Sequence, residues 1–87
     1  MEQYVILARS VTYAQRMQKL LGNADIYAQI FRAPRELSDL GCAYILRLPR
    51  QFIQQALDIL HLARMDPLKV FSEKNGSYRE VHLHDLL

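Results

Sequence analysis

Hydrophobic residues along the chain follow two spacings, one typical of strands and one typical of helices. Residues 4–8 form a continuous apolar run of the length of a buried strand. Apolar residues then recur every three or four positions and predict a helix that stops at Gly-Asn, residues 22–23; they are Ala14, Met17, Leu20 and Leu21. Ser10 and Thr12 are the candidate N-caps, and Thr12 with Gln15 fits a capping box.

An alternating pattern resumes over residues 26–33 and predicts a second strand. Pro34 ends the pairing of this strand because proline has no amide hydrogen to donate. Residues 35–41 are polar and typical of a turn, and they lead to a third apolar strand over residues 43–48. We therefore expect two neighbouring strands joined by a polar connection.

The second half of the chain contains the clearest helical pattern. Pro49 suits the first turn of this helix, and the Asp-Pro pair at residues 66–67 ends it. Its apolar stripe comprises Phe52, Ile53, Ala56, Leu57, Leu60 and Ala63. A fourth strand is expected over residues 68–72. Asn75-Gly76 then predicts a tight hairpin, followed by a fifth strand over about residues 78–83.

This order of elements predicts an α+β protein with a ferredoxin-like βαββαβ fold, an antiparallel sheet with two helices on one face and an added C-terminal hairpin strand. We expect a single domain over residues 1–87, with a core at about 4–72 and a hairpin and tail at 73–87. Nothing in this scheme covers the second face of the sheet.

Strand alternation places Ile45 on that second face, and Ile6 and Phe31 are further candidates for it. Exposed apolar patches often mark partner surfaces. The pattern therefore predicts docking on a larger protein or a homodimer through the uncovered sheet face.

Composition narrows the classes of function. The chain has 87 residues, of which 51% are hydrophobic and 23% charged, with a formal net charge of +2. Such a slight charge does not predict nucleic-acid binding, although Tyr27, Phe31 and Arg47 could be arranged on a sheet face that binds RNA. No apolar run approaches the ~20 residues of a membrane span, and the start of the chain lacks a basic secretory signal. We expect a cytoplasmic protein with no membrane or nucleic-acid partner.

Cys42 is the only cysteine, which excludes an intrachain disulfide and a zinc site made of several thiolates. It follows Gly41 at the start of the third strand. Arg32 and Arg35 lie in the same connection, and nearby cations favour the thiolate form of a cysteine. Arg47 lies on the same strand, but alternation points it to the opposite face. The alternative is that Cys42 fills the apolar interior.

Other chemistry has little basis in the sequence. His82 and His84 are two residues apart and could share a metal on a strand, with His61 or Asp85 as a further ligand. The preferred interpretation is that both histidines are exposed polar residues in the tail, so we expect neither a metal nor a cofactor.

The segment around Cys42 resembles the family of small selenium/sulfur carrier proteins, also described as a domain of unknown function. The resemblance covers about residues 4–71, and the proline–arginine–glutamate run that precedes the cysteine is its most characteristic part. The matching pieces are Arg9-Ser10, Leu20-Leu21-Gly22, Ala33-Pro34-Arg35-Glu36-Leu37-Ser38, Cys42 and Tyr44-Ile45-Leu46-Arg47-Leu48. The family usually has a glycine after the cysteine, whereas here Gly41 precedes Cys42 and Ala43 follows it.

The resemblance implies that Cys42 accepts a sulfur or selenium atom as a persulfide-type group and passes it to partner proteins. Arg32 and Arg35 would stabilise the anionic sulfur, and Ser38 and Gly41 would supply hydrogen bonds. Such a protein is a carrier between donor and acceptor proteins and not a turnover enzyme. The alternative hypothesis is a non-catalytic interaction module in which the cysteine is structural.

Overall fold

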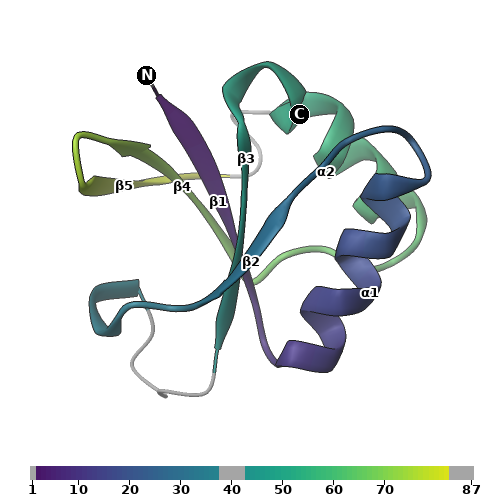
Figure 1. The fold of residues 1–87 in the computed structure, drawn as a ribbon, viewed down its shortest axis with the longest axis horizontal. Helices are drawn as coiled ribbons and strands as arrows, with labels where there is room; N and C mark the ends of the chain where they lie inside the picture. Colours follow the sequence, from purple (N-terminus) through teal and green to yellow (C-terminus); the bar gives the residue numbers. More distant parts are fainter. Residues whose placement is uncertain (1, 38–42, 83–87) are drawn as a thin grey trace.

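The computed structural model describes residues 2–37 and 43–82, which form a mixed α/β structure with a five-stranded antiparallel sheet and two α-helices (Figure 1). Its elements, in chain order, are β1 (Gln3–Ala8), α1 (Val11–Gly22), β2 (Gln29–Arg32), the 3-10 turn η1 (Arg35–Leu37), β3 (Tyr44–Pro49), the 3-10 turn η2 (Arg50–Phe52), α2 (Ile53–Leu62), β4 (Lys69–Lys74) and β5 (Ser77–Val81).

β1 lies at the centre of the sheet, whose strand order is β2-β3-β1-β4-β5. Ile6 of β1 pairs with Leu46 of β3 on one side and with Val70 of β4 on the other. Both helices lie on the same side of the sheet, and η1 lies on the other (Figure 1). Because β1 is hydrogen-bonded along both edges, its residues are the most completely buried of the sheet.

The first of the two candidate N-caps, Ser10, caps the first helix. The Ser10 hydroxyl accepts a hydrogen bond from the Tyr13 amide at 3.1 Å, so Ser10 is the N-cap and Thr12 is already inside α1. The capping box predicted at Thr12 is therefore wrong. The helix ends at Gly22 and is capped by Asn23, as predicted.

The second helix is shorter than its apolar stripe indicates. Pro49 is still part of β3, and a 3-10 turn separates it from α2. The helix ends at Leu62, and Arg64 adopts a left-handed backbone with φ 57°. A left-handed residue stops helical hydrogen bonding, so α2 ends before Asp66-Pro67 can act.

The hairpin at Asn75-Gly76 is confirmed. Asn75 and Gly76 have φ values of 53° and 81°, which fit a type I′ turn, the turn that matches the twist of the flanking strands. β4 and β5 pair within the chain, from Lys74↔Ser77 to Val70↔Val81. The fifth strand thus begins one residue earlier than predicted and ends at Val81.

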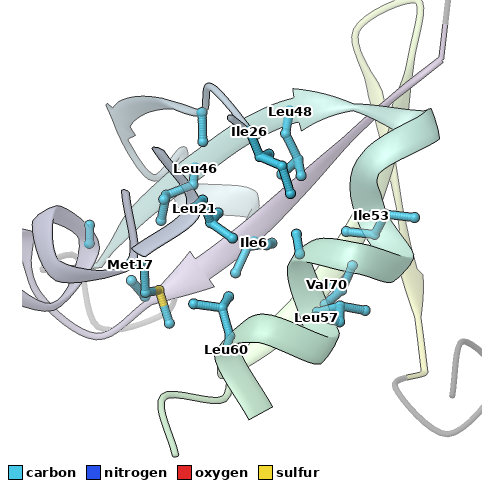
Figure 2. Packing of buried hydrophobic residues seen from close by; sticks show 14 residues of the cluster. Ile6, Met17, Leu21, Ile26, Leu46, Leu48, Ile53, Leu57, Leu60 and Val70 are labelled. Atoms are coloured by element: carbon cyan, nitrogen blue, oxygen red, sulfur yellow. The ribbon is translucent and has the colours of Figure 1, made fainter. Parts of the chain in front are cut away.

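The main core lies between the sheet and the helices (Figure 2). Ile6, Leu46 and Val70 point from the strands toward Met17 and Leu21 of α1 and toward Leu57 and Leu60 of α2, and all seven are at most 3% exposed. This burial explains the helical stripes in the sequence.

A second, smaller cluster corrects the expectation of an uncovered sheet face. Val5, Leu7, Ile45 and Phe71 are buried on the face away from the helices, and they pack with Leu37 of η1 and with Ala43. Ile45 is on this face, as predicted, but Ile6 faces the helices. The face is therefore partly covered by the connection between β2 and β3. Its Phe31, which pairs with Ile45, remains 40% exposed.

Candidate functional site

The connection that contains the candidate cysteine is tied together at its base. The Ala33 amide donates a hydrogen bond to the Ala43 carbonyl at 3.0 Å, which extends the β2–β3 pairing by one step and closes the segment 34–42. Within this segment, the Leu37 amide donates to the Pro34 carbonyl at 3.0 Å and forms the 3-10 turn. The first three residues of the predicted polar turn, Arg35–Leu37, therefore form the 3-10 turn η1.

Leu37 anchors this turn on the sheet. Its side chain is 7% exposed and packs in the cluster that includes Val5, Leu7 and Ile45. The flanking Arg35 and Glu36 are exposed. One buried side chain thus holds the turn down while its charged neighbours face outward. Sequence reasoning missed this role, which a single leucine within a polar run could have indicated.

The structure places two of the predicted site residues at one end of the sheet. Arg32 is the last residue of β2 and pairs in register with Tyr44, and Arg35 begins η1 three residues later. Both side chains are exposed. No carboxylate within the described part of the chain pairs with Arg35. The other predicted site residues, Ser38, Gly41 and Cys42, lie outside the described residues.

Arg47, on β3, forms an ion pair with an acidic residue of β4. Its Nε lies 2.8 Å from Oε1 of Glu73, and its Nη2 donates a hydrogen bond to Oε2 at 3.1 Å. The guanidinium carbon also lies 4.7 Å from the centre of the Phe31 ring. The charge-assisted contact with Glu73 therefore joins β3 to β4, and the cation–π contact with Phe31 joins β3 to β2, on the face of the sheet away from the helices.

The phenol of Tyr78, on β5, interacts with both members of the Arg47–Glu73 ion pair. Burial raises the pKa of Tyr78 above its ordinary value of 10.0, the Glu73 carboxylate raises it further, and Arg47 acts in the opposite direction. The folded protein therefore retains the phenol proton at a pH where the unfolded chain loses it. Folding stability from this group is fully present below pH 10 and falls as the pH rises through the folded pKa.

We expect Tyr78→Phe to remove part of this alkaline loss, because phenylalanine has no proton to release in the unfolded state. The measurement is the free energy of unfolding between pH 9 and pH 11, roughly one unit either side of the ordinary pKa. Tyr27→Phe is the control, since the Tyr27 side chain is 78% exposed. Equal slopes for wild type and Tyr78→Phe would contradict the assignment.

The histidines considered as metal ligands do not converge where they are described. His61 Nδ1 lies 3.0 Å from Oδ1 of Asp66, and His82 is exposed just after β5. His84 and Asp85 lie outside the described residues. Across residues 2–37 and 43–82, no group of three His, Cys, Asp or Glu side chains could hold a metal ion.

A family comparison agrees with the motif around the cysteine. The model of the family described as "Putative Se/S carrier protein-like" matches residues 3–72. The chain therefore belongs to this Se/S carrier-like family. No curated protein matches the chain, and no solved structure does either. Among the described residues, neither helix has the length and apolarity to cross a membrane.

Proposed function

We propose that this protein is a sulfur or selenium carrier in which Cys42 accepts the atom and delivers it to partner proteins. The Cys42 thiolate attacks the terminal sulfur of a donor persulfide, R–S–SH. The donor S–S bond breaks, its electron pair leaves with the donor thiolate, and the proton stays with the transferred group. The products are Cys42–S–SH and R–S⁻, with no net oxidation or reduction. A selenium atom would move in the same way.

The observation that carries this proposal is the family match over residues 3–72, which includes the whole segment from Pro34 to Cys42. The local geometry supports it. Arg35 is exposed and unpaired among the described residues, so it is available to a sulfur anion, and Arg32 brings a second positive charge to the same end of the sheet. Ser38 and Gly41 are proposed as hydrogen-bond donors to the anion. Ala43 and Ala33 fix the base of the segment.

A single cysteine suits such a carrier. A second thiol nearby would attack the bound persulfide and release the atom, and Cys42 is the only cysteine of the chain. We also propose a reducing cytoplasmic location, because a lone reactive thiol is readily oxidised in other compartments.

We further propose that the architecture is a ferredoxin-like fold and that residues 1–87 act as one domain. The order β2-β3-β1-β4 with both helices on one face supports this fold, and β5 extends it by one hairpin strand. A homodimer through the part of this sheet face that η1 leaves exposed also stays a proposal. Its support is the 40% exposure of Phe31 on that face.

The direct test is to incubate the protein with a cysteine desulfurase and cysteine and to measure its intact mass. We expect a gain of one sulfur atom, located on the proteolytic peptide that contains Cys42 and removed by a thiol reductant. Absence of added sulfur, or sulfur bound elsewhere in the chain, would contradict the proposal.

A further inference from the structure

Four polar side chains share one face of the hairpin formed by β4 and β5. Ser72 pairs in register with Arg79, and Lys74 pairs with Ser77. Because alternate residues of a strand share a face, all four lie on the same face as Val70, which belongs to the core between the sheet and the helices. Side chains paired in this way lie about 4.5–5.5 Å apart at Cβ, and diagonal ones about 7–8 Å. These four residues, the hairpin quartet, can therefore contact one small molecule.

The hairpin quartet lines a hollow of about 480 Å³, together with Asn75 of the turn and with Glu2. This volume is within the range of roughly 300–1,000 Å³ that is typical of small-molecule sites. The hairpin lies at the edge of the sheet, where β5 is the outermost strand (Figure 1). Lys74, Ser77 and Arg79 are exposed, so a ligand can reach the hollow from solution.

The two acidic residues of the hairpin lie on its other face. Glu73 and Glu80 each follow a member of the quartet along their strands, so their side chains point away from the hollow. Each also has a cationic partner. Oε1 of Glu73 lies 2.8 Å from Nε of Arg47, and Oε1 of Glu80 lies 3.8 Å from Nζ of Lys69. Neither carboxylate is therefore placed to neutralise the quartet.

Positive charge predominates at the hollow itself. Among residues 2–37 and 43–82, no carboxylate pairs with Lys74 or Arg79. Glu2 also lines the hollow, but its Oε1 lies 3.2 Å from Nη1 of Arg50, which balances its charge. The Ser72 hydroxyl makes only a long contact of 3.5 Å to the Arg79 carbonyl, so it can donate to a ligand instead. Two cations and two serine hydroxyls thus favour an anion.

We propose that this hollow binds the phosphate group of a small phosphate ester. A phosphate monoester carries close to two negative charges at neutral pH and three strong acceptor oxygens. It therefore matches two cations and two hydroxyls better than a carboxylate does. The Arg79 guanidinium can donate to two phosphate oxygens at once, and the Lys74 ammonium balances the remaining charge from the diagonal position. The volume of the hollow leaves room for the organic part of the ester.

This site is separate from the proposed carrier chemistry. The hairpin turn lies at the end of the sheet where Gln3 pairs with Pro49 and Glu73, whereas the connection that contains Cys42 joins β3 at its other end, next to Tyr44. The family model matches residues 3–72, so most of the residues that line the hollow follow the matched region. Phosphate binding therefore does not depend on sulfur transfer.

The site can be located in the wild-type protein with inorganic phosphate and glycerol phosphate as probes. Each is titrated in place of chloride at constant ionic strength, and backbone amide NMR records the response. We expect saturable shifts centred on residues 72–79 with both probes. Shifts without saturation, or shifts spread over basic residues throughout the chain, would overturn the proposal. Saturation with inorganic phosphate but not with glycerol phosphate would overturn the assignment to an ester.

The test variant is Lys74→Gln with Arg79→Gln, and the matched control is Lys19→Gln with Arg16→Gln. Each removes one lysine and one arginine, and all four side chains are exposed. The control residues lie on α1, outside the hairpin. We expect the test variant to bind glycerol phosphate about tenfold more weakly than wild type, and the control to stay within about twofold. Equal weakening in both variants, or no weakening in the test variant, would contradict the site.

Discussion

Replacing Cys42 with serine is expected to abolish sulfur uptake, whether the donor is a desulfurase or polysulfide. The serine hydroxyl does not ionise near neutral pH, and the chain contains no other thiol to take over. Intact mass after incubation measures the result, and the gain of one sulfur atom seen in wild type should be absent. Persistent uptake in Cys42→Ser would rule out the assigned acceptor.

The same variant distinguishes the carrier from a structural module. If Cys42 is reachable by a donor protein, serine should change the free energy of unfolding by less than about 0.5 kcal/mol, as at most surface positions. A cysteine that fills the interior would instead bury a hydroxyl on replacement, at a cost of about 1–3 kcal/mol. Rapid alkylation of the folded wild-type protein at neutral pH would agree with the first outcome.

Replacing Leu37 with alanine is expected to destabilise the fold by about 2–3 kcal/mol, because it removes buried methyl groups and leaves a cavity beside Val5, Leu7 and Ile45. The effect should be larger than that of replacing the exposed residues of the same turn, Arg35 and Glu36. Urea unfolding at equilibrium gives the free energy directly.

The neighbouring exposed residue provides the matched control for Leu37. Glu36→Ala changes a side chain of the same turn without removing a buried contact, and it should cost less than about 0.5 kcal/mol. A Leu37→Ala variant as stable as Glu36→Ala would show that the turn does not depend on its packing against the sheet.

The order and type of the elements could be predicted because the two spacings of hydrophobic residues have direct physical causes. Met17 and Leu21 face the same core as Leu57 and Leu60, so both helical stripes appear in the sequence. The Asn-Gly turn was equally clear, because few residue pairs accept two successive positive φ values. Family resemblance, not spacing, indicated the selenium/sulfur carrier, and the match over residues 3–72 confirms that family.

Boundaries and long-range contacts were less predictable. The second strand was expected from residue 26, but β2 starts at Gln29, because the Ile26 amide donates to the Leu21 carbonyl and the Ala28 carbonyl accepts from the Gln18 side chain. The position of Ile6 depended on register, and one step in alternation moves a side chain to the other face. The partnership of Arg47 with Glu73 joins residues far apart in sequence, so local patterns carry no signal for it.

The hydrogen bond between Ala33 and Ala43 has a consequence for how such proteins can diverge. Because strand pairing closes below the segment 34–42, insertions or deletions above that bond need not shift the register of β2 against β3. Doubling the length of a flexible loop costs only about 0.6 kcal/mol. The scaffold can therefore accept exchanged segments of different length, provided that a grafted segment keeps an apolar side chain at the position of Leu37 to cover Val5, Leu7 and Ile45.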